Sequence, residues 1–179
     1  MAVESPAAAL GAAAPEFTLR GTDGRMHSLH ELRGARGTLV VFICNHCPYV
    51  QAVLPRLLRD ARELAPLGSN VIAINPNDAE AYPEDSYARM VEAARDWPFP
   101  CLHDETQQVA RAYGAVCTPD FSATTPSCAC ATAAAWMPAA SSRSMTRRAS
   151  CSRLCSASSA GNCRRRGNTR PWVARSSGA

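Results

Sequence analysis

Hydrophobic and polar residues follow strand-like and helix-like patterns in turn along residues 1–121. Phe17 and Leu19 alternate with polar residues and precede Asp23-Gly24, a pattern typical of a β-hairpin. Two nearly continuous apolar runs, residues 38–43 and 71–74, have the length of strands and few polar interruptions. Such runs are typical of strands that are buried on both faces of a sheet.

Helical spacing of apolar residues begins directly after the first of these buried strands. One apolar stripe predicts a helix that packs on the sheet, and it consists of Val50, Val53, Leu54, Leu57, Leu58, Ala61 and Leu64. We expect shorter helices at 28–32, 84–95 and 104–112, the last opened by a capping box of Asp104 and Gln107. With a short strand at 99–102, the order ββ(α)βαβαβα indicates an α/β sandwich around a mostly parallel central sheet.

The motif Cys44-Asn45-His46-Cys47-Pro48 lies where the first buried strand passes into the long helix. The N-terminus of a helix favours negative charge, so an exposed Cys44 thiolate is expected to be stabilised there. The sequence therefore predicts a redox-active dithiol in which Cys44 attacks and Cys47, one turn inside, resolves the mixed disulfide. His46 either adds positive charge near the thiolate or is simply solvated.

A CxxC motif is also compatible with half of a zinc site, which needs a second pair of ligands at matching spacing. The available partners are Cys128, Cys130, Cys151 and Cys155, all of which lie beyond residue 121. The strand–CxxC–helix order favours redox chemistry over zinc binding. We expect neither a metal nor another cofactor.

Residues 122–179 differ in kind from residues 1–121. They contain 9 Arg and no Asp or Glu, whereas residues 1–121 contain 10 Arg against 15 Asp and Glu. Beyond Phe121 the only Leu, Ile, Val or Phe residues are Leu154 and Val173. We therefore divide the chain into an incomplete redox domain, 1–121, and an Ala/Ser/Arg-rich tail, 122–179, which is too poor in large apolar residues to form a core.

The tail is best explained as DNA translated in a wrong reading frame. In a shifted frame, Trp136-Met137 forces a GAT codon for Asp and Trp172-Val173 forces a GGT codon for Gly. Over 123–138 that frame permits a strand-like sequence containing Tyr-Arg-Gly. Over 167–178 it permits a C-terminal sequence different from the printed one. A basic nucleic-acid arm centred on residues 164–166 is the alternative, but no aromatic residues are interleaved with it for base stacking. We expect no nucleic-acid partner.

A wider set of residues carries a specific family pattern, in segments 14–19, 42–50, 74–78, 104–106 and 117–121. In these segments the chain resembles the thioredoxin-like members of the alkyl hydroperoxide reductase/thiol-specific antioxidant (AhpC/TSA, redoxin) superfamily. The resemblance implies a thioredoxin-like three-layer sandwich whose last strands and helix are missing from this chain. It also implies that Thr118-Pro119 is a cis peptide facing the CxxC motif. His46, Pro48, Thr118 and Pro119 are then expected to support the dithiol.

The same superfamily contains peroxiredoxins, whose reactive cysteine follows the pattern Pro-x-x-x-Thr-x-x-Cys. Measured from Cys44, the Thr position holds Val41 and the Pro position holds Gly37. A thiol–disulfide oxidoreductase is therefore the favoured function, with an antioxidant thiol peroxidase that uses Cys44 as the alternative. The expected partners are protein or small-molecule disulfides and a reducing system.

The N-terminal residues predict a cytoplasmic location. Residues 1–16 are Ala-rich but lack a basic region, and Glu4, Pro6 and Pro15 interrupt them, so they do not resemble a signal peptide. No apolar run approaches the roughly 20 residues of a membrane span, so no membrane partner is expected. In that compartment the nine cysteines are expected to be reduced, catalytic or metal-bound rather than paired as structural bridges.

Overall fold

The computed structural model describes residues 12–126 and 130–135 of the 179-residue chain. Its strands are β1 (Thr18–Gly21), β2 (Met26–Ser28), β3 (Gly37–Phe42), β4 (Ser69–Asn75), β5 (Cys101–His103), β6 (Asp120–Thr124) and β7 (Cys130–Ala135). Its helices are α1 (Leu29–Leu32), α2 (Pro48–Leu64), α3 (Tyr87–Ala93) and α4 (Gln108–Tyr113), with 3-10 turns η1 (Ala65–Leu67) and η2 (Pro83–Asp85). No helix within these ranges combines the length and the apolar character that crossing a membrane requires.

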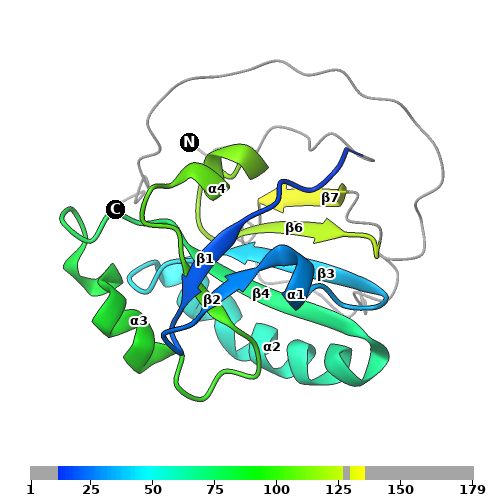
Figure 1. Cartoon of the computed structure of the whole chain (residues 1–179). Helices are drawn as coiled ribbons and strands as arrows, with labels where there is room; N and C mark the ends of the chain where they lie inside the picture. The colour runs from blue at the N-terminus through cyan, green and yellow to red at the C-terminus, as the bar shows by residue number, and fades with distance from the viewer. Residues whose placement is uncertain (1–11, 127–129, 136–179) are drawn as a thin grey trace, which may run out of the picture.

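The strands of the described residues form one mixed sheet in the order β2-β1-β5-β4-β3-β6-β7 (Figure 1). The parallel part is confined to the three central strands, because β3 pairs with β4 and β4 with β5 in parallel. The outer pairs are antiparallel, including the predicted β1–β2 hairpin and the pairs that β6 makes with β3 and β7. The ends of β3 and β4 that precede α2 and η2 therefore lie side by side.

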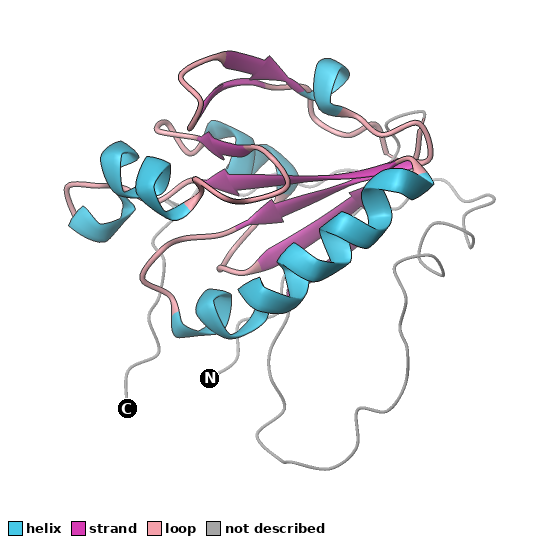
Figure 2. Ribbon diagram, turned by 90° about the horizontal axis from the view of Figure 1, so that it is seen from below, coloured by secondary structure: helices cyan, strands magenta, loops and turns pink. Residues whose placement is uncertain are grey.

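Helices cover both faces of this sheet, which gives the three layers of a thioredoxin-like sandwich (Figure 2). Strict alternation along β3 and β4 divides their side chains between two cores. Val40 and Phe42 pack on the α1 and α4 side, whereas Val41 packs on the α2 and α3 side. All three are at most 1% exposed, because a strand covered on both faces has no side that needs polar residues. The α/β sandwich predicted from the sequence is confirmed, but its sheet is mixed rather than mostly parallel, since only β3–β4 and β4–β5 pair in parallel.

Two predicted helices begin later than the sequence pattern indicates. The helix expected at 84–95 starts at Tyr87, because Asp85 turns into the interior and Ser86 has an extended backbone (ψ 149°). The helix expected from Asp104 starts at Gln108, because Gln107 adopts a left-handed conformation (φ 60°). The predicted capping box is therefore wrong, although the Asp104 carboxylate still caps α4 by accepting the Ala110 N–H at 2.9 Å.

The predicted domain boundary at residue 121 falls inside β6, and the expectation that the last strands are missing is wrong. β6 pairs with β3 from Thr38 to Phe42, and β7 then pairs with β6, so β3 is not left as an exposed edge. Ladder hydrogen bonds come from the backbone and do not require large apolar side chains. Small residues suffice here: Ala123 and Thr124 are buried, and Thr124 Oγ1 donates to the Thr38 carbonyl at 3.3 Å. The expected disorder of the tail and the final helix concern residues 127–129 and 136–179, which lie outside the described residues.

Candidate redox site

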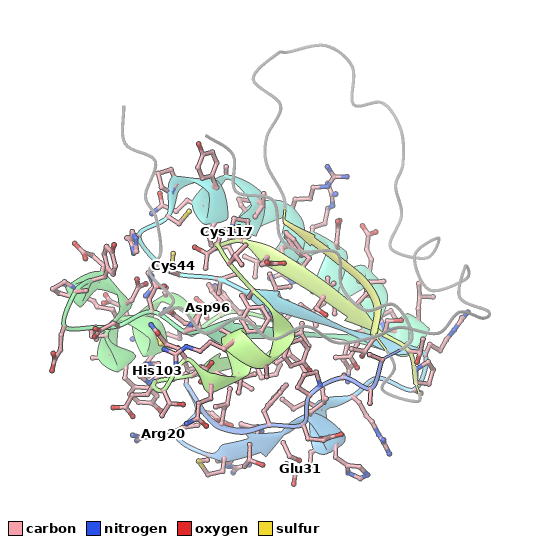
Figure 3. The ribbon with its side chains drawn as sticks, turned by 90° about the horizontal axis from the view of Figure 1, so that it is seen from above. Arg20, Glu31, Cys44, Asp96, His103 and Cys117 are labelled. Atoms are coloured by element: carbon pink, nitrogen blue, oxygen red, sulfur yellow. The ribbon has the colours of Figure 1, made fainter. Side chains whose placement is uncertain are left out.

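The register of the sheet brings the predicted site residues together. Phe42, the last residue of β3, pairs with Asp120, the first residue of the antiparallel strand β6. Cys44 therefore emerges two residues after this pair, and Thr118 lies two residues before it. Figure 3 shows Cys44 and Cys117 at this end of the sheet, where β3 leaves toward α2.

Thr118 contacts both sulfurs of the motif. Its Oγ1 lies 2.9 Å from Cys44 Sγ, and its carbonyl oxygen accepts from Cys47 Sγ at 3.3 Å. Both cysteines are free thiols. The Thr118-Pro119 peptide bond is cis, as the family resemblance implied. The structure thus places Cys44, Cys47, Thr118 and Pro119 in one site.

The expected exposure of the two thiols is wrong. Cys44 is only 1% exposed and belongs to the core beneath α2, whereas Cys47 is half-buried. Cys47 is the N-cap residue of α2 and Pro48 is exposed at its first turn, where a proline needs no backbone N–H. The difference arises because β3 ends at Phe42, so that Cys44 still lies over the sheet, and the helix begins only after Cys47.

The two thiols also differ in acidity. The pKa of Cys47 is lowered to about 5, first by its hydrogen bond with Cys44 and further by the backbone N–H groups of Val50 and Tyr49 in the first turn of α2. The pKa of Cys44 is raised by that same hydrogen bond, by burial and by the negative charge of Asp85. One proton shared by this pair therefore resides on Cys44.

Asp85 is a residue of this site that the sequence did not indicate. It is fully buried, and both of its carboxylate oxygens accept hydrogen bonds. Oδ1 accepts from the Asn45 N–H (2.5 Å) and from Asn75 Nδ2 (3.3 Å), and Oδ2 accepts from Asn77 Nδ2 (2.7 Å). The hydrophobic pattern placed Asp85 inside a regular helix, where it had no partner. In the sequence, only Asn75 and Asn77 at the end of β4 pointed to a buried carboxylate, because two buried amides need a hydrogen-bond acceptor.

His46 is the remaining partner of Asp85. Its Nδ1 lies 2.6 Å from Asp85 Oδ2, and its ring stacks on Tyr82 with centroids 4.5 Å apart and planes 8° apart. The side chain of His46 is 20% exposed. Of the two alternatives left open by the sequence, a merely solvated His46 is therefore excluded, and its ring is fixed beside the dithiol.

Cys44 Sγ, a ring nitrogen of His46 and a carboxylate oxygen of Asp85 lie within 4.8 Å of one another, a spacing that would suit a metal ion. However, both oxygens of Asp85 already accept hydrogen bonds from well-placed donors. A cation would have to displace those donors. The arrangement suits orientation of His46 better than metal coordination, and the absence of a metal remains a prediction.

The described residues include two further thiols, Cys101 and Cys117. Cys101 lies in β5 at 3% exposure, and burial raises its pKa to about 12, so it is a core residue. Cys117 is half-buried and precedes Thr118. The proposed zinc partners Cys128, Cys151 and Cys155 and the basic residues 164–166 lie outside the described residues, and for Cys130 only the strand β7 is described.

Comparison with known proteins supports the fold. An uncharacterized conserved protein from Geobacillus kaustophilus has a similar structure (TM-score 0.73), with 43% identity over 76% of this chain and 74% of that chain. A hypothetical protein from Sinorhizobium meliloti has the same TM-score with 35% identity, over 77% of this chain and 76% of that chain. A secreted Mycobacterium tuberculosis disulfide oxidoreductase, 18% identical, shares the fold at a TM-score of 0.57 over 70% and 87% of the two chains.

No curated protein matches the chain. The model of the AhpC/TSA family matches residues 10–137, which is most of the chain and includes every site residue described above. The match extends beyond residue 121, in agreement with the continuation of the sheet through β6 and β7. The chain therefore belongs to the AhpC/TSA family of thioredoxin-like thiol redox proteins.

Proposed function

We propose that the protein is a thiol–disulfide oxidoreductase whose dithiol is Cys44 and Cys47. The observation that carries the proposal is the pairing of two free thiols against Thr118, with Cys47 at the N-terminus of α2 and Cys44 buried beside it; the pKa of Cys47 is lowered and that of Cys44 raised. Such a pair holds one reactive thiolate and one protonated thiol at neutral pH. That is the state from which a dithiol can attack a disulfide and then close into its own disulfide.

The overall reaction transfers two electrons. The reduced pair converts a disulfide R–S–S–R′ into two thiols and becomes the Cys44–Cys47 disulfide. The natural substrates are then protein or small-molecule disulfides, and a separate reducing system regenerates the dithiol. In a reducing compartment such as the cytoplasm, the dithiol is the resting form.

A thiol peroxidase that uses Cys44 is the alternative function. A peroxidatic thiolate must meet peroxide directly, and Cys44 is 1% exposed with a raised pKa. These two features argue against a peroxidase that uses Cys44.

Insulin reduction and peroxide consumption, each measured with dithiothreitol as reductant, separate the two functions. We expect the wild-type chain to accelerate insulin reduction, and the Cys44→Ser and Cys47→Ser variants each to lose that acceleration. Catalysed peroxide consumption without catalysed insulin reduction would overturn the proposal. Titration against glutathione redox buffers, with the Cys44–Cys47 disulfide followed by peptide mass spectrometry, then gives the reduction potential.

A further inference from the structure

The two sulfurs of the dithiol lie in opposite electrostatic surroundings, although only two residues separate Cys44 from Cys47 in the sequence. Cys47 caps a helix of 17 residues, so its sulfur lies at the positive end of the α2 dipole, next to the free N–H groups of the first turn. Cys44 Sγ lies within 4.8 Å of a carboxylate oxygen of Asp85, whose side chain is completely buried, and of a ring nitrogen of His46, which contacts that carboxylate. Negative charge is therefore stabilised on the Cys47 side and opposed on the Cys44 side.

Accessibility differs in the same direction. A disulfide substrate must bring one of its sulfurs into line with the attacking sulfur. Cys44 is 1% exposed, under α2 and against the Thr118 hydroxyl, so a substrate cannot reach it without rearrangement. Cys47 is half-buried at the start of α2 and has the exposed residues Pro48 and Tyr49 after it.

From these two asymmetries we propose that Cys47 is the attacking cysteine and Cys44 the resolving one, the reverse of the order that the CxxC sequence suggests. The assignment rests on the proposed function and specifies how its dithiol works. Thr118 contacts both sulfurs: its hydroxyl lies against Cys44 Sγ, and its carbonyl oxygen accepts a hydrogen bond from Cys47 Sγ while Cys47 is protonated.

The chemistry balances in two steps. The Cys47 thiolate attacks R–S–S–R′, the Cys47–S–R bond forms, and R′–S⁻ leaves. Cys44 then attacks the Cys47 sulfur, the Cys44–Cys47 disulfide forms, and R–S⁻ leaves. The proton lost by Cys44 passes to one of the two departing thiolates. The substrate has gained two electrons and the enzyme has lost two.

Alkylation of the reduced wild-type protein with iodoacetamide at pH 6, mapped by peptide mass spectrometry, tests the order without any substitution. A thiol with a pKa near 5 is almost fully ionised at pH 6, whereas one near 8.5 is not. After correction for the lower nucleophilicity of an acidic thiolate, Cys47 should react roughly tenfold faster than an ordinary free thiol. Cys44 should react more slowly than Cys47. Earlier modification of Cys44 would overturn the proposal.

Single-cysteine variants provide the second measurement, with the aromatic disulfide DTNB as the substrate probe. Cys44→Ser should attack it quickly and keep a stable mixed disulfide on Cys47. Cys47→Ser should react at the slow rate of the double variant Cys44→Ser/Cys47→Ser, which reports the remaining cysteines. Fast formation of a mixed disulfide on Cys44 in Cys47→Ser would overturn the proposal.

Different results would refute the oxidoreductase function and the reversed order of attack. If the wild type never closes the Cys44–Cys47 disulfide after DTNB attack, the oxidoreductase function fails, and the alkylation map still shows which sulfur is the nucleophile. If insulin reduction is catalysed but Cys44 is alkylated first, the function holds and the reversed order is wrong.

Discussion

Neutralising Asp85 should make the Cys44 thiol markedly more acidic. The carboxylate oxygen and Cys44 Sγ lie within 4.8 Å of each other, and Cys44 is 1% exposed. Two unit charges at that distance interact by about 3.5 kcal/mol at an effective dielectric constant of 20. That energy corresponds to about 2.5 pKa units. Because an asparagine keeps a dipole in the same place, we expect Asp85→Asn to lower the pKa of Cys44 by about two units.

The measurement requires Cys44 to be the only titrating thiol of the site. Both Asp85→Asn and its reference are therefore made in a Cys47→Ser background, and thiolate formation is followed by absorbance at 240 nm. The spectrum of the Cys44→Ser/Cys47→Ser double variant is subtracted to remove the other cysteines. Asp96→Asn is the matched control, because Asp96 is an exposed aspartate outside the site, in the segment between α3 and β5.

Asp85→Asn also disturbs packing, because one amide oxygen replaces an acceptor for several buried donors. Removing one partner of a buried polar network costs about 3–5 kcal/mol of folding free energy. Circular dichroism and Asp85→Glu separate the two effects, since glutamate keeps the charge and should keep the pKa of Cys44 high. If Asp85→Asn folds and the pKa of Cys44 stays within a few tenths of its reference, the electrostatic role assigned to Asp85 is refuted.

Four further predictions concern the fold and the gene. Phe42→Ala should lower the free energy of unfolding, measured in urea, by about 3–5 kcal/mol. The reason is that Phe42 is 1% exposed and its ring centroid lies 5.5 Å from that of Tyr113. A loss below about 1 kcal/mol would contradict the place of Phe42 in the core. Asp104→Ala should cost about 1–2 kcal/mol through loss of the α4 cap. Burial raises the pKa of Asp104, so the folded protein binds the carboxyl proton more tightly than the unfolded chain does. The protein therefore loses stability as pH rises from the pKa of the unfolded carboxyl through the raised pKa of the folded one. The stability of Asp104→Asn relative to the wild type should therefore rise between pH 4 and pH 7. A difference in unfolding free energy that does not change with pH would contradict the raised pKa of Asp104. Resequencing the gene over codons 121–179 should reveal a shifted reading frame, and an intact frame that encodes this tail would disprove the frameshift.

Sequence periodicity predicted the central part of the fold because burial on both faces leaves a strong pattern. The runs at 38–43 and 71–74 correspond to β3 and β4, and the stripe from Val50 to Leu64 lies in α2. The position of the CxxC motif between β3 and α2 was also predicted. The pattern could not reveal β6 and β7, since small residues such as Ser122 and Ala123 carry almost no hydrophobic periodicity, and their pairing comes from the backbone.

The environment of the dithiol was harder to predict because its main determinant is distant in the sequence. Asp85 lies 39 residues after His46 and meets it only because β3 and β4 are parallel neighbours whose ends lie together. Its sequence neighbours Pro83 and Glu84 gave no reason to expect a buried carboxylate. The exposure of the two cysteines depended on a similar detail, the exact residue at which β3 ends.

The asymmetry of the dithiol follows from that end point. If the chain left the sheet several residues before the first cysteine, that sulfur would reach the helix N-terminus and the second would turn inward. Here Ile43 still donates its N–H to Ile74 of β4 at 2.9 Å, so Cys44 follows directly from the last backbone contact with the sheet. In the short connection that follows, the Asn45 N–H and the His46 ring both contact the Asp85 carboxylate, and the helix starts at Pro48. The thiol that meets the free N–H groups of α2 is therefore the second one of the motif. A CxxC pattern specifies a dithiol, but the length of the strand before it decides which sulfur carries the negative charge.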